Sequence, residues 1–559
     1  MVCFPWYTYL RILYQSAIII VSITENMNIM KLNKLIYTSL IAVILSVTAC
    51  KNGFEEINKP WDKDVAAPVE QLYNGLVSTL VLGWQEQVTY HTWIYPITQQ
   101  AVTTSNSGYV LANAASELWS NYYLALGNFR LLEKRIEESP NKDKYKNLQA
   151  MAKTIMAYKT LKVSEFFGAM PYTEAGRAAT EGAAAYRAKY DSQADVFKSA
   201  LAELKWAVDN FSTSADQISI GGYETFLKGD ITQWTKFANS LRLRYALTMS
   251  AKDAATATPI ITEALAKPLL ADGENIAIWP KALNLTLDGR RWSFNSGLFH
   301  RMGTTMWSYM SSNDNKDGSG IFDPRCKIFF EPNNAGQWAP YPQNPTTATV
   351  GEGGLPYDNI RLTSWATKGA GNLYSPLNYY FAQDQTTIPE PIFTAAEIHF
   401  LKAEIYTSGI GATKNLTTAK GEYEKGVTAS VNFWTKVAMD SPEWVVSKPT
   451  ALPSAATITA LLTNAKVAFD ATNEANALKQ IYAQMWVDGF RQPWDVWALK
   501  RRTGNLTPMT TVNSAYYDSN FGIYHRLVYP SSEADYNSAN WRTATGGADL
   551  TSTKTWLEK

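Results

Sequence analysis

Apolar residues recur at steps of three and four along much of this chain, which is the spacing of an amphipathic helix. One such stretch begins at Trp119, and its apolar positions are Tyr122, Tyr123, Leu126, Phe129, Leu132 and Ile136. A short polar turn at 139–141 follows, and residues 148–161 repeat the pattern. A helix, a tight turn and a second helix of similar length predict an αα-hairpin.

The same unit recurs further along the chain. Helical spacing returns over residues 196–211, 233–250, 394–406, 420–434 and 474–490, and a short helix is expected from Pro493 to a stop at Gly504. Repeated hairpins of this size predict a tetratricopeptide-like stack in which each hairpin buries its apolar face on the next. We therefore expect a mainly α fold, with helical hairpins over about 68–250 and 392–504.

Residues 268–391 interrupt the helical pattern. This segment holds 12 of the 32 glycines and 11 of the 24 prolines, together with several tryptophans. Its composition predicts a loop-rich insert, with short strands or turns, packed on one side of the helical stack. Its aromatic content argues against disorder.

The N-terminus has the pattern of an export signal. Lys31 and Lys34 precede an apolar run over 35–47, and the small residues Thr48 and Ala49 stand before Cys50. The run is shorter than the roughly 20 residues that cross a bilayer. A cysteine at this point resembles a bacterial lipobox, which predicts lipidation of Cys50. The alternative is an ordinary secretory signal that happens to end near a cysteine.

Residues 1–49 therefore lie outside the expected mature protein. The first 26 residues fit poorly, and a signal that starts at Met27 or Met30 is complete by itself, so we expect the true start there. We interpret 1–49 as a mis-started leader plus a lipoprotein signal peptide. Residues 50–559 are expected to form a single body.

Composition excludes some functions. The full chain has 51 basic and 50 acidic residues, and residues 1–49 hold three and one of these, so the mature net charge is −1. A protein that binds nucleic acid needs an excess or a stripe of basic residues, and this charge balance does not provide an excess. Of three cysteines only Cys326 remains once Cys3 is removed and Cys50 is lipidated, so no internal disulfide is expected. The unusual component is aromatic, with 19 Trp and 31 Tyr.

The sequence contains few motifs that would indicate catalysis or metal binding. The four histidines are widely spaced, and the chain contains no HExxH, CxxC or GxSxG motif. Residues 313–318 (NDNKDG) resemble the first half of a calcium loop, but Pro324 stands where the closing Glu belongs, so we interpret them as a polar turn. His399 and Arg325 are expected to be structural. We expect no cofactor and no metal.

Several short sequence motifs resemble those of a known family. In chain order they are Phe166–Tyr172 (FFGAMPY), Trp234–Tyr245 (WTKFANSLRLRY), Asp323-Pro324-Arg325, Ala395–Glu404 (AAEIHFLKAE), Tyr423–Ser430 (YEKGVTAS), the stretch from Trp494 to Gly504, and Tyr529–Glu533 (YPSSE). Each motif alone is weak. Together, behind a lipobox, they resemble the SusD/RagB family of Bacteroidetes outer-membrane lipoproteins, in its SusD-like branch, from about residue 50 to the C-terminus.

The resemblance implies a function without catalysis. Such proteins sit on the cell surface beside a SusC-like TonB-dependent transporter of the outer membrane, capture a nutrient and act as a lid on the barrel. The nutrient is usually a glycan and sometimes a peptide. The matching motifs belong to helix faces and turns and identify no ligand contact. The resemblance therefore assigns a role to Cys50 alone, as the lipidation site. Glu55 and Glu56 follow it, although Lys51-Asn52-Gly53 is not an ideal surface-export sequence.

The ligand candidates come from sugar chemistry. Exposed Trp and Tyr rings cover the apolar C–H faces of sugars, while oriented polar groups bond the hydroxyls. The candidates are the loop aromatics Trp93, Tyr95, Trp292, Trp307, Trp338, Tyr341 and Trp365. For each of them core packing is the alternative. A peptide-binding member of the family, an exported glycoside hydrolase with two catalytic carboxylates and a pure interaction scaffold remain open as other functions.

Overall fold

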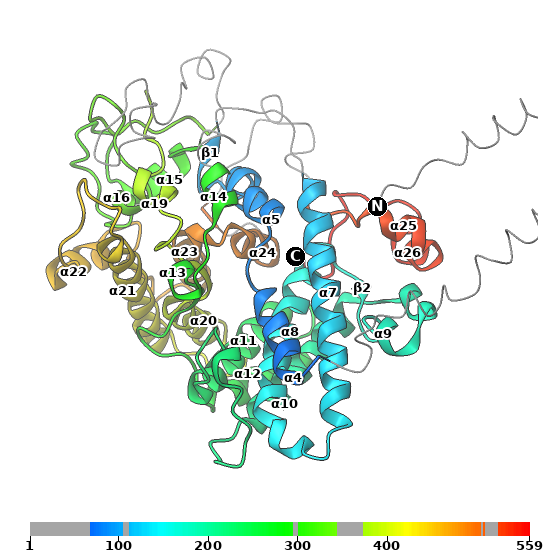
Figure 1. Ribbon diagram of the computed structural model, residues 1–559. Helices are drawn as coiled ribbons and strands as arrows, with labels where there is room; N and C mark the ends of the chain where they lie inside the picture. The colour runs from blue at the N-terminus through cyan, green and yellow to red at the C-terminus, as the bar shows by residue number, and fades with distance from the viewer. Residues whose placement is uncertain (1–66, 104–110, 294–299, 344–372, 505–506, 509–523) are drawn as a thin grey trace, which may run out of the picture. The chain divides into compact units, whose positions relative to one another are not determined.

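The computed structural model describes residues 67–103, 111–293, 300–343, 373–504, 507–508 and 524–559, and within them helices predominate (Figure 1). From Pro68 to Lys559 the contacts form one compact unit. This confirms the mainly α, tetratricopeptide-like fold class. Within the described ranges, no helix combines the length and apolar character needed to span a bilayer.

The strands are short and pair only in antiparallel twos in the part of the chain that is described. They are β1 (Val102–Thr103) with β5 (His300–Arg301), β2 (Met170–Pro171) with β3 (Tyr190–Asp191), and β4 (Ile276–Ile278) with β6 (Glu390–Phe393). Each pair joins segments distant in sequence. β4 and β6 thereby bring the start of the loop-rich segment to its end.

The N-terminal helices pack as successive hairpins. They are α4 (Val69–Ser78), α7 (Leu111–Glu137), the 3₁₀ turn η3 (Lys142–Tyr145), α8 (Lys146–Phe167), α10 (Gln193–Asn210), α11 (Ile231–Ser250) and α12 (Ala254–Leu265). The apolar positions predicted for α7 are buried at Tyr122, Leu126, Phe129 and Leu132. Side chains of Ser192, Asp230 and Asp253 accept a backbone N–H at the starts of α10, α11 and α12, which stabilises those helix ends.

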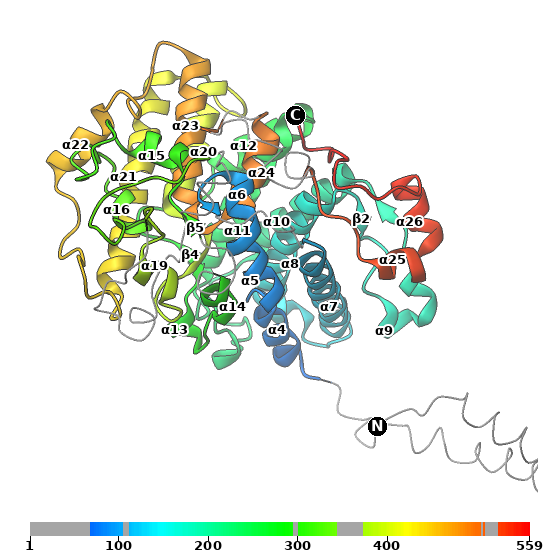
Figure 2. The same ribbon diagram turned by 90° about the horizontal axis from the view of Figure 1, so that it is seen from above.

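The C-terminal helices form a second group of hairpins (Figure 2). They are α20 (Ala395–Ser408), α21 (Leu416–Asp440), α22 (Ala455–Thr463), α23 (Glu474–Asp488) and α24 (Pro493–Thr503). α20 packs against both α21 and α23. Gly426 permits the close crossing of α20 and α21, because a Cβ there would lie 2.6 Å from the ring of Phe400. As predicted, α24 starts at Pro493 and is closed by Gly504 in the left-handed region.

Between these groups, residues 268–391 carry only short elements. They are β4, α13 (Pro280–Leu283), α14 (Asp288–Trp292), β5, α15 (Thr304–Met310), α16 (Cys326–Phe329), α19 (Tyr379–Gln383) and the start of β6. Their aromatic and aliphatic side chains share a second hydrophobic core with the C-terminal helices, in which Phe329 and Phe381 pack against Trp434 of α21. The loop-rich character is as predicted, and much of its aromatic content fills this core.

Short elements complete the described fold. α5 (Trp84–Thr89), a π-helical turn η2 (Tyr90–Ile94) and α6 (Tyr95–Thr98) form one continuous run. The others are α9 (Ala178–Glu181), η4 (Ala183–Arg187), η5 (Gly221–Tyr223), η7 (Gly489–Arg491), α25 (Ser531–Tyr536) and α26 (Ser538–Thr545). A π-helical turn is rare inside helices and frequent near functional sites.

Arg325 ties the loop-rich segment to the C-terminal helices. It pairs with Asp323 at 2.7 Å, and neither side chain is exposed. The guanidinium also donates to Ser430 Oγ of α21 at 2.9 Å and to Gln484 Oε1 of α23 at 2.7 Å. These buried contacts agree with the structural role expected for Arg325.

We predict that Arg325→Met lowers the free energy of unfolding by about 3–5 kcal/mol, because it leaves the Asp323 carboxylate buried without its partner. The double variant Asp323→Ala/Arg325→Met should recover much of that loss. Urea denaturation followed by circular dichroism measures both. Lys142→Ala, which removes an exposed pair with Glu137, serves as a control and should leave the midpoint unchanged. A single variant as stable as the wild type would contradict the buried-pair account.

Candidate ligand-binding surface

The helices α5 and α14 lie side by side (Figures 1 and 2). Where they meet, two tryptophans form an exposed aromatic pair. Trp84 is 45% exposed and Trp292 is 42% exposed. Their ring centroids lie 6.3 Å apart with the planes tilted by 50°. Large apolar side chains left in water beside each other are a feature of binding surfaces rather than of cores.

Trp84 is held by the first turn of α5. It follows Gly83, whose backbone N–H donates to Glu86 Oε2 at 3.2 Å. The backbone N–H of Glu86 in turn donates to Glu117 Oε2 of α7 at 2.8 Å. Two of the N–H groups that lack an intrahelical partner at the helix start are thus satisfied, which stabilises the turn that carries Trp84.

The contact between α14 and α5 depends on a glycine. A Cβ on Gly289 would lie 3.0 Å from the backbone oxygen of Trp84 and 3.0 Å from Gln87 Cβ. The next residue, Arg290, donates its backbone N–H to Gln87 Oε1 at 3.2 Å. Because Gly289 has no Cβ, α14 and α5 can approach closely enough for Trp292 and Trp84 to lie beside each other.

Arg290 anchors α14 in the interior. Its guanidinium is fully buried and donates to Glu390 Oε1 at 2.8 Å, to the Ile388 oxygen at 2.9 Å and to the Asp384 oxygen at 2.7 Å. Burial, with the nearby charge of Arg491, lowers the pKa of Arg290 to about 10, so it remains cationic at neutral pH.

Glu390 is the centre of this anchor. Arg491 Nη2 and His91 Nε2 lie 3.3 and 3.4 Å from its Oε1. Burial opposes its ionisation, but the charges of His91, Arg491 and Arg290 hold the pKa of Glu390 well below its usual range. Trp292, two residues beyond Arg290, is therefore attached to a fixed buried charge cluster.

Exposed polar residues flank the aromatic pair. Asp288 and Arg291, both exposed, belong to the same short helix as Trp292. Thr286 donates to the Asp288 carboxylate at 3.0 Å, whereas the Arg291 side chain makes no hydrogen bond or ion pair with another described residue. An aromatic platform edged by such groups can stack on the apolar face of a sugar and bond its hydroxyls.

Four of the other sequence candidates are buried. Trp307 and Trp338 are 2% and 7% exposed and stack on each other at 6.2 Å. Tyr95 is covered and donates its hydroxyl to the Phe490 oxygen at 2.6 Å, and Tyr341 packs against the ring of Tyr374. In this structure these four rings belong to the core, so they offer no open face to a ligand.

Three candidates cannot be placed. Cys50, Trp365 and the side chain of Trp93 lie outside the described part of the chain. Of the predicted ligand residues, the structure therefore leaves Trp292 on the described surface. It adds Trp84, which the sequence candidates did not include because they were chosen among aromatics expected to stand in loops. Its position directly after Gly83 was the available signal.

Residues 313–318 form a turn closed by their own side chains. Asn313 Oδ1 accepts the Asn315 N–H, and Asp317 Oδ1 accepts the Ser319 N–H. Asp314 accepts a hydrogen bond from the indole of Trp307 at 2.8 Å. These bonds agree with the polar turn predicted there. Among the described residues, no three His, Cys, Asp or Glu side chains gather as a metal site would require.

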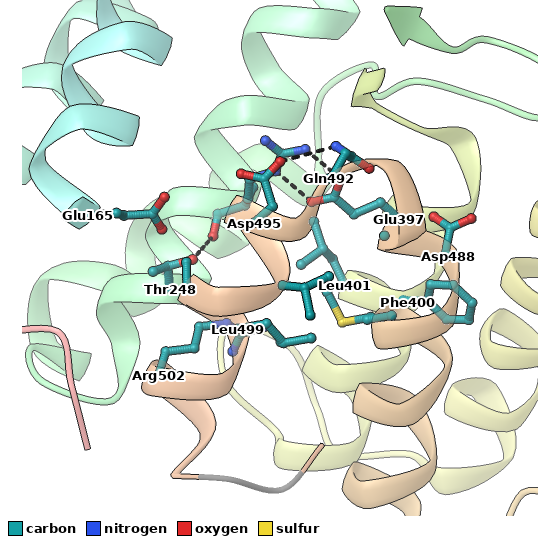
Figure 3. A pocket seen from close by; sticks show the side chains of 15 residues that line it. Glu165, Thr248, Glu397, Phe400, Leu401, Asp488, Gln492, Asp495, Leu499 and Arg502 are labelled. Carbon is teal, nitrogen blue, oxygen red and sulfur yellow. Dashed lines mark hydrogen bonds and ion pairs between the residues drawn. The ribbon is translucent and has the colours of Figure 1, made fainter. Parts of the chain in front are cut away.

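Three of the motifs that carry the family resemblance, over 234–245, 395–404 and 494–504, contribute side chains to an internal cavity (Figure 3). Glu165 of α8, Arg244 of α11, Glu397 of α20 and Asp495 of α24 surround a space of about 70 Å³. Arg244 clamps both oxygens of Glu397. A space of this size holds ordered water but no sugar, since ligand pockets are several times larger. We therefore assign this cavity to the scaffold.

A family model described as starch-binding and associating with the outer membrane matches residues 63–530. The chain belongs to the SusD-like family. This confirms the resemblance seen in the sequence, and membership supports a nutrient-binding role in association with the outer membrane. No curated protein matches this SusD-like chain significantly.

Solved structures match the SusD-like chain along most of its length. A chitin-binding protein shares 23% identity at a TM-score of 0.66, over 88% of this chain and all of the other. A SusD homolog from Bacteroides fragilis shares 19% at 0.66, over 88% and 99%. A chitin-binding SusD homolog from Flavobacterium johnsoniae shares 20% at 0.62, over 88% and 98%. At these identities the likeness establishes the fold.

The cavity leads to a prediction about pH. Burial, with the nearby negative charge of Asp495, raises the pKa of Glu165 from 4.5 to about 8. The folded state therefore favours the neutral acid. The stability from this group is fully present below about pH 4.5, declines as pH rises, and is lost above about pH 8.

We predict that Glu165→Gln, which cannot ionise, gains stability relative to the wild type between pH 5 and pH 9. Urea denaturation at pH 5, 7 and 9 gives the difference at each pH. Glu181→Gln, on the exposed end of α9, controls for the loss of a surface charge and should show no such trend. A difference between Glu165→Gln and wild type that does not vary with pH would refute the assignment.

Proposed function

We propose that this SusD-like protein is a lipid-anchored cell-surface protein that captures a glycan and delivers it to a SusC-like TonB-dependent transporter of the outer membrane. The observation that carries the proposal is the exposed Trp84–Trp292 pair. Two indole rings on helices that are fixed from below form a preorganised platform, so binding costs little ordering of the protein.

Sugar is the ligand class that the platform fits best. Its rings offer stacking surface, and Arg291 and Asp288 offer hydrogen bonds beside it. The family description names starch, and two similar structures are named as chitin-binding. These descriptions support a neutral polysaccharide as the cargo of this chain. A peptide cargo is the second candidate inherited from the family resemblance, and the binding test below separates the two.

We infer that the protein binds without catalysis. A glycosidase needs two carboxylates that flank the scissile bond. Beside the aromatic pair, Glu86 and Glu117 accept backbone N–H groups of the α5 start, and Asp288 accepts from Thr286. This supports a ligand that is held and released intact, which incubation with a labelled oligosaccharide checks.

We predict that Trp84→Ala and Trp292→Ala each weaken glycan binding about tenfold, because each removes one stacking surface worth roughly 0.5–1.5 kcal/mol beyond its area. Isothermal titration with chitohexaose and maltoheptaose measures the loss. Tyr186→Ala, which removes an exposed ring from η4, is the matched control and should bind as the wild type does. Unchanged binding in both tryptophan variants would overturn the site, and binding only to a peptide pool would move the protein to the peptide-importing class.

We predict that Cys50→Ala moves the protein from the membrane fraction to the soluble fraction, because the lipid chains have no other attachment point in a lipobox. Cell fractionation and immunoblotting measure the shift. Cys50→Ser, which also removes the thiol that is lipidated, should give the same shift. Full membrane retention of both variants would contradict lipidation.

We also predict that the wild-type protein, extracted in mild detergent and immunoprecipitated, brings down a large β-barrel protein. The absence of such a protein would argue against the transporter partnership.

A further inference from the structure

A second, larger hollow runs along the outer face of α21. It encloses about 830 Å³, and residues of α21 from Gly421 to Asp440 form one wall. At 1.5 Å per residue, that stretch of helix is about 28 Å long. The opposite wall is formed by Asp272, Gly273, Asn275, Trp279, Ala395 and Leu452. We call this feature the α21 groove.

An aromatic side chain stands in the wall of the α21 groove. Trp279 directly follows β4, is the N-cap residue of α13, and is half-buried against the ring of Phe433, with centroids 6.3 Å apart and planes at 75°. Within the described chain, its indole N–H makes no hydrogen bond. A half-exposed indole ring offers an apolar face together with an N–H donor, which suits a ligand that has both apolar and hydroxyl surface.

Each charged side chain that lines the α21 groove has a hydrogen-bonding or ion-pair partner among its neighbours. Lys425 pairs with Glu422 at 3.0 Å, and Lys436 pairs with Asp440 at 3.0 Å. Glu424 lies 2.8 Å from Lys420, and Asp272 lies 2.7 Å from His399 Nε2. Such exposed pairs add little stability. The walls carry Asp272, Glu424 and Asp440 against Lys425 and Lys436, a net charge of −1 spread along the groove, which offers little to a strongly ionic partner.

The uncharged polar groups are the ones left open. Asn432, half-buried in the middle of the wall and next to Phe433, makes no side-chain hydrogen bond to any described residue. Thr428 lies one turn away, and its hydroxyl donates to the Glu424 backbone oxygen while retaining its acceptor sites. An amide, a hydroxyl and an indole N–H around an aromatic ring match a neutral polyhydroxylated chain.

We propose that the α21 groove is a second binding site, separate from the Trp84–Trp292 pair, for an uncharged oligosaccharide. The proposal rests on the proposed function in that both sites take the same class of ligand. Residues 279–292 carry Trp279 at one end and Trp292 at the other, with α13 and α14 between them. One long polysaccharide that engages both sites gains affinity from the second contact, since that contact becomes intramolecular.

The test measures each site by itself. Hydrogen–deuterium exchange of the purified mature protein is followed with and without chitohexaose and maltoheptaose. Peptides over 272–279 and 421–440 report on the α21 groove, and peptides over 84–89 and 288–293 report on the Trp84–Trp292 pair. We expect protection in both sets with the same sugar.

Variants then separate contact from indirect effects. Asn432→Ala removes an amide without a described partner, so the fold should be unaffected, and Trp279→Ala removes the aromatic wall. Each should abolish protection of 421–440 while 84–89 stays protected, and each should weaken binding to the polymer, glycol chitin or soluble starch, by about a hundredfold. Asn334→Ala, an exposed asparagine on another loop, is the control.

The outcomes distinguish the two proposals. Protection confined to 84–89 and 288–293 overturns the second site and leaves the proposed function standing. Protection of the groove peptides alone supports the second site and overturns the Trp84–Trp292 pair as the primary platform. No protection anywhere by either sugar overturns both, as does groove protection by a peptide pool in place of sugar.

Discussion

The buried carboxylate of Glu390 is the constraint on which the ligand-binding surface depends. Its neighbours Arg290, His91 and Arg491 come from α14, η2 and η7, segments separated by as much as 400 residues of chain. A carboxylate removed from water is costly unless cations and hydrogen bonds replace the water. The cluster therefore persists only when all these segments are in place, which joins η2, the loop-rich segment and the η7 turn into one arrangement.

This anchor gives short helices the rigidity that a binding surface needs. α14 has five residues, too few to be stable as an isolated helix. It is held by Arg290 in the interior and by the close approach at Gly289, and Trp292 follows at its end. Preorganised rings on fixed elements bind with less loss of freedom than rings on loose loops. The buried ion cluster thus acts on binding by holding the backbone that carries the ring.

The helices could be predicted from the sequence because their apolar spacing records one buried face. The face of α7 at Tyr122, Leu126 and Phe129 is an example, and the Pro493 and Gly504 ends of α24 followed from local backbone rules. The exposure of an aromatic residue has no such local signature. Trp307 and Trp338 stand in a loop-rich segment, yet they stack on each other, because segments far along the chain close a second core over them. Trp84, in contrast, begins α5 and is exposed, while Trp307 lies within α15 and is buried.

The same distinction explains why the family resemblance identifies the fold but no ligand contact. Its motifs contain two ion pairs of the interior, Arg244 with Glu397 and Arg325 with Asp323. Loss of one member leaves the charge of the other unpaired. Such residues can change only together. Trp84 and Trp292 each keep more than two fifths of their surface in water, so replacing them removes little packing. A surface built this way can alter its ligand at small cost in stability, and the scaffold beneath it therefore carries no record of which ligand is bound.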